Sequence, residues 1–144
     1  MSRIDDAFRR MREEKRTGLV TYVTAGDPSL PMTGAILKRL DTVGADVLEV
    51  GVPFSDPLAD GPVIQRATER ALAGGATRAG VLDMLAGVRK DIRAPIVIFS
   101  YANPILRMGL DAFVARAQAA GVDGVLTLDV PPEEAEDLRG RFEA

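Results

Sequence analysis

Two carboxylates in this sequence stand where a folded protein rarely places them without a use. Glu49 lies inside the apolar run Asp46-Val-Leu-Glu-Val-Gly51, which otherwise has the composition of a buried strand. Asp60 lies in the Pro-rich loop that follows directly. An isolated carboxylate in a protein core costs several kcal/mol. The pair is therefore a candidate for acid–base chemistry or for stabilising a positive charge that develops during a reaction.

The residue types present limit what else could do chemistry. The chain has no cysteine and no histidine. A disulfide, a thiolate metal site and a cysteine nucleophile are thus excluded, and the commonest general base and metal ligand is missing. Acid–base work must fall to Asp, Glu, Lys, Arg or Tyr, and we expect no metal.

Charge and hydropathy narrow the class of protein further. Lys and Arg total 18 against 21 Asp and Glu, a net charge of −3, and no long basic block occurs, which argues against nucleic-acid binding. The charged first residues lack the apolar stretch of a signal peptide. No apolar run approaches the roughly 20 residues needed to span a membrane. We therefore expect a cytoplasmic protein without membrane contact.

Hydrophobic periodicity predicts alternating strands and helices. Ser29 or Asp27, Thr77 and Asp111 are candidate helix caps. The predicted strands cover 18–24, 47–51, 95–101 and 124–128, and the predicted helices cover 3–15, 31–43, 62–72, 78–88, 111–120 and 132–141.

The predicted fold class is α/β, with an N-terminal helix followed by four strand–helix units in a single domain, 1–144. Strands that are apolar throughout and separated by amphipathic helices indicate a parallel sheet. The first turn, Thr24-Ala-Gly-Asp-Pro28, has neither a dinucleotide fingerprint nor a phosphate-loop lysine. A (β/α)₈ TIM barrel fits better, because its functional groups lie at the carboxyl ends of strands, as Glu49 does.

Such a barrel needs eight strands and about 250 residues, whereas this sequence has 144 residues and four predicted strands. The expected structure is therefore a half-barrel with two bare sheet edges. We expect that the chain is a piece of a longer barrel, or that it closes by pairing with another copy or another half.

Structural roles compete with functional ones for several residues. Glu49 could be a core anion with a partner, or could lie on a misjudged surface strand. Asp60, beside Gly61-Pro62, could cap a helix or form a turn. Tyr22 and Tyr101 are more typical of core residues than of catalysts, and Asp129 is interpreted as a cap of the next turn.

A long motif carries a family resemblance. The segment Glu49-Val-Gly-Val-Pro-Phe-Ser-Asp-Pro-Leu-Ala-Asp-Gly-Pro-Val-Ile-Gln65 closely resembles the signature of the tryptophan synthase α subunit family. Tyr22–Pro28, Ser100–Pro104 and Gly121–Pro131 resemble the same family in the same order. The resemblance covers the whole chain but only the N-terminal half of the family.

The resemblance implies a reaction: retro-aldol cleavage of indole-3-glycerol phosphate to indole and glyceraldehyde 3-phosphate in tryptophan biosynthesis. It makes Glu49 the acid/base that serves indole C3 and the glycerol hydroxyl. It makes Asp60 the acceptor of the indole N–H, where positive charge develops.

The resemblance also places four residues around the indole. These are Tyr22, Ile64, Phe99 and Leu126. Phe is common in the family where this chain has Tyr22, and a smaller aliphatic residue is usual at the position of Phe99. Both departures would change the fit of the pocket and not the reaction.

A partner is implied as well, the β subunit of an α₂β₂ complex. The residues that would meet it are Pro53, Asp56, Pro57, Asn103 and Pro131. From the residues alone, Asp56 before a proline is turn chemistry or a subunit contact. Pyridoxal phosphate belongs to the β subunit, so no cofactor is expected in this chain.

Phosphate in such barrels binds near strands 7 and 8, so we expect this chain alone to be inactive or nearly so. Two other functions stay open. One is a non-catalytic, self-associating half-barrel. The other, which the Pro-rich loop disfavours, is a different phosphosugar lyase or isomerase on the same fold.

Overall fold

The computed structural model of the chain describes residues 2–143, the side chain of residue 137 excepted. Four strands alternate with seven α-helices and two short 3₁₀ segments among these residues. The order is α1 (Arg3–Glu13), β1 (Val20–Thr24), α2 (Leu30–Thr42), β2 (Val47–Gly51), α3 (Pro62–Ala73), α4 (Arg78–Val88), η1 (Arg89–Asp91), β3 (Ile96–Ser100), α5 (Ala102–Met108), α6 (Leu110–Ala119), β4 (Gly124–Thr127), η2 (Pro132–Glu134) and α7 (Glu136–Phe142).

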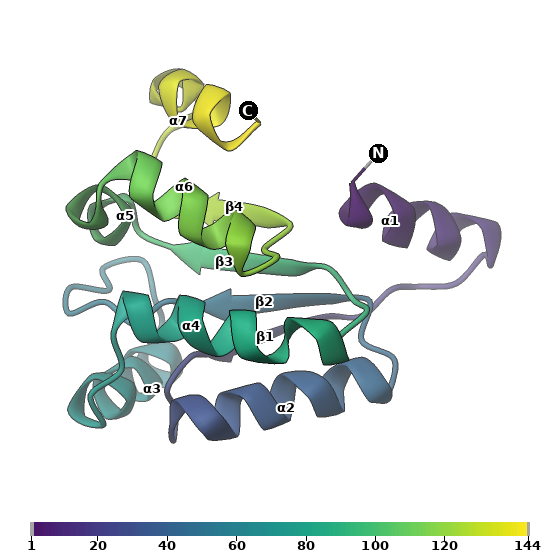
Figure 1. Cartoon of the computed structure of the whole chain (residues 1–144), viewed down its shortest axis with the longest axis horizontal. Coiled ribbons are helices and arrows are strands. Elements are labelled where there is room, and N and C mark those ends of the chain that lie inside the picture. The colour runs from purple at the N-terminus through teal and green to yellow at the C-terminus, as the bar shows by residue number, and fades with distance from the viewer. Residues whose placement is uncertain (1, 144) are drawn as a thin grey trace.

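The strands form one parallel sheet in the order β1-β2-β3-β4, so each strand pairs with its neighbours in the sequence (Figure 1). Tyr22 of β1 pairs with Glu49 of β2, which pairs with Val97 of β3. Gly51 pairs with Phe99, which pairs with Leu126 of β4. The predicted α/β class, the four parallel strands and the N-terminal helix are confirmed.

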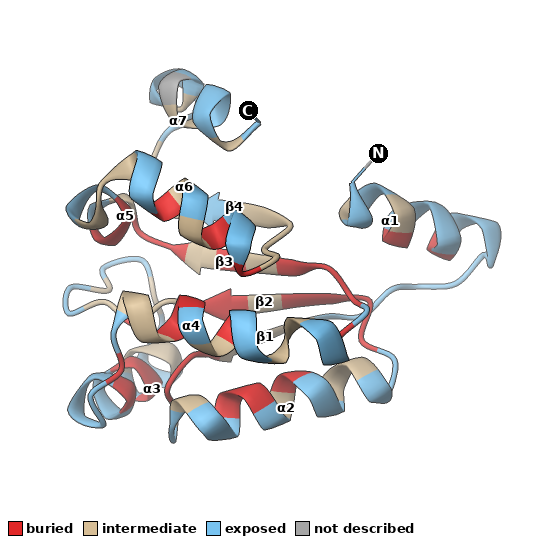
Figure 2. Ribbon diagram, in the orientation of Figure 1, coloured by how far each residue is buried: buried red, intermediate tan, exposed pale blue. Residues whose placement is uncertain are grey.

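One face of the sheet carries the hydrophobic core. Leu48, Val50, Ile96 and Ile98 are completely buried against apolar side chains of α2, α4 and α6, such as Leu37. These helices lie over the same face of the sheet (Figure 1), and Figure 2 shows buried residues along β2 and β3. Neighbouring residues along a strand point to opposite faces, so the residues between these core positions point to the other, less covered face.

Local signals explain most helix starts. Ser29 and Thr77 cap α2 and α4, and their side chains accept from the backbone N–H groups of Met32 and Gly80. Pro62 begins α3, where its missing N–H costs nothing. Of the two cap candidates for α2, Ser29 is therefore correct.

Two expectations about the fold need correction. Helix α5 was not predicted, because its seven residues contain no apolar repeat long enough to detect; Pro104 is tolerated in its first turn. The prediction that Asp111 caps α6 is wrong, since that helix begins at Leu110 and Gly109 holds the cap position without a side-chain bond. Asp111 instead lies in the first turn, where its charge complements the helix dipole.

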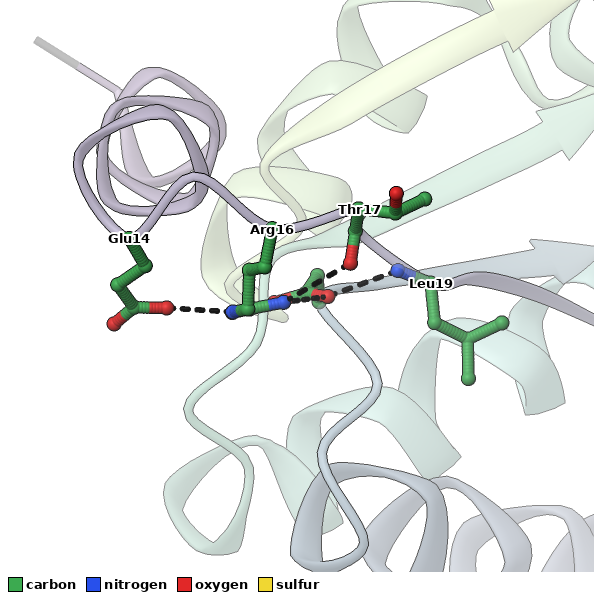
Figure 3. Close-up of polar contacts among 5 residues, drawn as sticks. Glu14, Arg16, Thr17 and Leu19 are labelled. Carbon is green, nitrogen blue, oxygen red and sulfur yellow. Dashed lines mark hydrogen bonds and ion pairs between the residues drawn. The ribbon is translucent and has the colours of Figure 1, made fainter.

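The amino ends of the strands are held together by ion pairs. Asp46, just before β2, accepts two hydrogen bonds from the Arg16 guanidinium, at 2.8 and 2.6 Å, and one from the Leu19 N–H at 2.9 Å. Figure 3 shows Arg16 on the segment between α1 and β1, with its guanidinium also directed toward Glu14. The arrangement fixes the N-terminal helix segment to the sheet.

None of the helices in the described part of the chain combines the length and apolar character needed to cross a membrane.

Candidate active site

The register of the sheet places four of the predicted site residues on one face. Tyr22 and Glu49 are paired positions, as are Phe99 and Leu126. Because Glu49 and Gly51 are two residues apart, both pairs point to the same face of the sheet, opposite the fully buried Leu48 and Val50. Four of the residues chosen from the sequence therefore share the less covered face of the sheet.

Glu49 is half-buried on β2, between the buried neighbours Leu48 and Val50. No ion pair involving it occurs among residues 2–143. This argues against the alternative of a core anion held by a cation. A carboxylate on a strand that makes no salt bridge is available to an incoming ligand.

Tyr22 links the two carboxylates electrostatically. Its ring meets the Phe99 ring edge to face, with centroids 5.4 Å apart. Gly51 gives the phenol room, since a Cβ there would collide with the Tyr22 hydroxyl. Burial raises the pKa of Tyr22, and the charges of Asp60 and Glu49 raise it further, while a hydrogen bond with Thr24 opposes the shift. Both carboxylates thus act on a single hydroxyl group.

Asp60 lies at the end of the β2–α3 loop and is half-buried. The cap position of α3 is Gly61, which makes no side-chain bond, so the alternative that Asp60 caps this helix is wrong. The Gln65 side-chain amide donates to the Asp60 carbonyl at 2.8 Å and fixes the backbone at this point.

Ile64 lies on α3 and lines, together with Tyr22, a hollow of about 260 Å³ beside β1. Its other walls include Ile36, Val63 and Ala67. The lining does not include Glu49 or Asp60. The structure therefore brings Ile64 to Tyr22, in a hollow that neither carboxylate lines.

Other acidic residues at the carboxyl ends of the strands have structural partners. Asp27, after β1, accepts two hydrogen bonds from the Arg70 guanidinium, at 2.9 and 2.7 Å, which hold its pKa below the usual value. Asp129, after β4, accepts from the Ala102 N–H at 2.7 Å. It therefore caps α5 and not the turn that follows it in the sequence. Nowhere in residues 2–143 do three or more acidic side chains gather as metal ligands would.

The five residues expected to meet a partner differ in accessibility. Asp56, Asn103 and Pro131 are exposed, Pro57 is half-buried and Pro53 is buried. Leu58, in the same loop as Asp56, exposes 93% of its surface. The loop after β2 thus presents a large apolar side chain beside an acidic one at this end of the sheet.

Tyr101 is the residue that the sequence interpretation missed. It is buried, as expected of a core residue, but its hydroxyl accepts a hydrogen bond from the Ala59 N–H at 2.9 Å. Its pKa is raised by burial and by the nearby Asp60, against the effect of the Ala59 bond. Its place at the carboxyl end of the predicted strand 95–101 was the signal that could have identified it.

A parallel sheet with core helices on one face and unpaired carboxylates on the other, near the carboxyl ends of its strands, is half of a (β/α)₈ barrel. The family described as "Tryptophan synthase alpha chain" matches residues 8–144. A relative of that name from Geobacter sulfurreducens is 53% identical over 139 residues, which are 96% of this chain and 53% of the relative. One from Laribacter hongkongensis is 53% identical over 138 residues, 95% of this chain and 52% of the relative.

Solved structures support the same family assignment. Tryptophan synthase subunit alpha from Legionella pneumophila superposes with a TM-score of 0.95 at 44% identity, over 99% of this chain and 55% of that one. An aminoacrylate-bound tryptophan synthase structure from M. tuberculosis gives 0.93 at 38% identity, over 99% and 58%. This chain belongs to the tryptophan synthase alpha chain family. It spans about half the length of the curated relatives that it matches.

Proposed function

We propose that this chain provides the acid–base half of an active site that cleaves indole-3-glycerol phosphate to indole and glyceraldehyde 3-phosphate, the work of a carbon–carbon lyase in tryptophan biosynthesis. The observation that carries the proposal is the placement of Glu49 and Asp60. They come from one strand and the loop that follows it, neither is in an ion pair within residues 2–143, and both act on the Tyr22 hydroxyl.

The reaction needs one proton delivered and one removed. Protonation of indole C3 allows the bond between C3 and the glycerol carbon to break. The adjacent glycerol hydroxyl loses its proton and becomes the aldehyde carbonyl. Glu49 serves both transfers, because a single carboxyl group can give a proton and take one back.

Positive charge spreads over the indole nitrogen when C3 is protonated. Asp60 accepts the indole N–H and stabilises that charge, a placed anion of the kind worth about 10²–10³ in rate. Tyr22, Phe99 and Leu126 on the sheet face, and Ile64 on α3, supply apolar and aromatic contacts for the ring. The tyrosine hydroxyl adds a polar group to that wall. No cofactor takes part in these steps.

The β2–α3 loop is the surface that we propose meets a β subunit, the subunit that holds pyridoxal phosphate. Exposed Leu58 beside exposed Asp56 supports this, since an apolar side chain ringed by polar residues is typical of an interface. We further propose that residues 1–144 act as one domain within the barrel and in the cytoplasm.

A hybrid protein tests the proposed function directly. In it, this chain replaces the matching half of the Geobacter sulfurreducens relative. We expect the hybrid to release indole from indole-3-glycerol phosphate, and the Glu49→Gln form to be roughly 10²–10⁴-fold slower. Circular dichroism on both proteins controls for folding. Equal turnover by two folded proteins would remove Glu49 from its role.

Self-association through the open sheet edges is a second candidate, and apolar side chains on the less covered sheet face favour it as well. Val20 and Leu126 are 47% and 40% exposed. Sedimentation of the chain by itself distinguishes the two states: a dimer supports pairing through this face, and a stable monomer at high concentration contradicts it.

A further inference from the structure

The β2–α3 loop that carries Asp60 is fixed by a residue from a different strand. Tyr101 follows β3 directly and is only 5% exposed. Its hydroxyl accepts from the Ala59 N–H, 42 residues earlier in the chain and one residue before Asp60. The donor–acceptor distance of 2.9 Å is that of a well-formed hydrogen bond.

A second contact holds the other end of the same loop. The rings of Phe54 and Tyr101 lie 5.3 Å apart between centroids, at 42° to each other. The Val52 N–H donates to the Phe99 carbonyl at 2.9 Å where the loop leaves β2. One aromatic side chain therefore touches the loop near its beginning and hydrogen-bonds it near its end.

The hydroxyl also acts on Asp60 itself. Burial and the negative charge of Asp60 raise the pKa of Tyr101, so this carboxylate lies within electrostatic reach of the hydroxyl. A phenol that accepts from the backbone can donate its own proton to the carboxylate, because a hydroxyl has one donor and two acceptor sites. The hydroxyl that accepts from residue 59 thus has a proton left to donate to residue 60.

We propose that Tyr101 is a positioning residue for Asp60, holding the loop backbone at Ala59 and the Asp60 carboxylate so that it meets the indole N–H. This inference rests on the role proposed above for Asp60. Tyr101 does not contact the reacting atoms. It sets where the stabilising charge stands, and displacement of a catalytic group by about 1 Å can cost 10²-fold in rate.

The test is Tyr101→Phe in the hybrid protein. Phenylalanine keeps the ring and its packing against Phe54 and removes only the hydroxyl. We expect kcat to fall roughly ten- to hundredfold while KM changes little, because the charge on the indole develops only in the transition state. An unchanged kcat in a folded variant would overturn the proposal.

Thr77→Ala is the matched control. It also removes one hydroxyl that hydrogen-bonds a backbone N–H, at the start of α4 and away from the carboxylates. We expect its melting temperature to fall by a few degrees, comparable to that of Tyr101→Phe, with no change in kcat. A loss of kcat in this control equal to that in Tyr101→Phe would assign the effect to stability and overturn the positioning role.

Two NMR measurements on the chain itself do not depend on turnover. Hydrogen exchange at the Ala59 amide should accelerate in Tyr101→Phe, whereas the Gln65 amide, bonded to the Gly61 carbonyl, should not change. In Asp60→Asn the pKa of Tyr101 should fall toward its ordinary value, because the negative charge that raises it is gone. If neither signal moves, the contact is absent and the proposal fails. If both move while hybrid turnover is insensitive to Asp60→Asn, the contact stands and the proposed function is what fails.

Discussion

The two ends of the sheet use the same acidic residue types in opposite ways. At the amino ends, Asp46 is bound by Arg16, and Asp123 is bound by Arg3 at 3.0 Å and by Arg89 at 3.7 Å. At the carboxyl ends, neither Glu49 nor Asp60 forms an ion pair within the described residues 2–143.

The acids at the two ends are of the same residue types and differ in whether they have ion-pair partners. A carboxylate with a guanidinium and backbone N–H groups around it has its charge satisfied and holds elements together. A half-buried carboxylate without an ion-pair partner is available to a ligand. Both ends of one parallel sheet carry acids, so the contrast can be tested by neutralising one acid at a time.

The largest expected effect is on turnover at the carboxyl end. Asp60→Asn in the hybrid should reduce kcat by about 10²–10³-fold, because the amide cannot stabilise positive charge on the indole nitrogen. The melting temperature should stay within about 2 °C of the parent. Asp60 has no ion pair that the substitution would remove, and substitutions of this kind usually change stability little. The assay is indole release, read beside a thermal melt.

A large loss of stability in Asp60→Asn, with kcat retained in the folded fraction, would reverse the contrast. Asp60 would then be a structural residue like those at the amino ends. Asp56→Asn is a suitable control, as it neutralises an exposed acid in the same loop.

The second prediction concerns stability at the amino end. Asp46→Asn should lower the free energy of unfolding by about 1.5–3 kcal/mol, the range for hydrogen bonds to charged groups. The asparagine oxygen can still accept from Leu19, but the paired bonds with Arg16 are lost. Urea denaturation measures the change, and kcat at a temperature well below the melt should be that of the parent.

The sequence predicts the strands of the sheet better than it predicts the contacts between distant segments, and the reason is physical. Hydrophobic periodicity, a property of neighbouring residues, located all four strands. Tyr22, Phe99 and Leu126 were identified by the family resemblance, and it is the sheet register that places them on one face with Glu49.

Contacts between distant segments were not predictable in this way. The bond from Ala59 to Tyr101 and the capping of α5 by Asp129 join segments 42 and 27 residues apart. Periodicity contains no information on which loops meet. A tyrosine at the end of a predicted strand and an aspartate after another strand therefore received generic interpretations, as a core residue and as a cap of the adjacent turn.

The third prediction is a pH dependence at the amino end. The Arg16 guanidinium lowers the pKa of Asp46 from 3.8 to about 2. The ionised form is therefore favoured in the folded state, and the stability that it contributes is complete above the unfolded-state value and lost as the pH falls from about 4 toward 2. Asp46→Asn lacks this titrating group.

The comparison of the two proteins measures that contribution. The difference in unfolding free energy between parent and Asp46→Asn should be largest near neutral pH and should shrink as the pH falls through this window. A difference that stays constant down to pH 2 would mean that the charge of Asp46 contributes nothing to stability.

The smallest expected effect comes from the ion pair that breaks the pattern, Asp27 with Arg70 at the carboxyl end. Arg70 is 59% exposed and Asp27 is 20% exposed. Arg70→Ala should therefore cost only about 0.2–1 kcal/mol, and less at high salt, since exposed pairs are weak and screened. Urea denaturation at low and high salt checks this.

The turnover of Arg70→Ala tests whether an acid with an arginine partner takes part in the reaction. If paired acids are structural wherever they lie, kcat in the hybrid should equal that of the parent, even though Asp27 follows a strand as catalytic residues in barrels do. A fall of more than about tenfold, which is 1.4 kcal/mol in barrier height, exceeds what the weak pair contributes to stability. It would mean that position along the strand, and not the presence of an arginine partner, decides which acids of this sheet take part in the reaction.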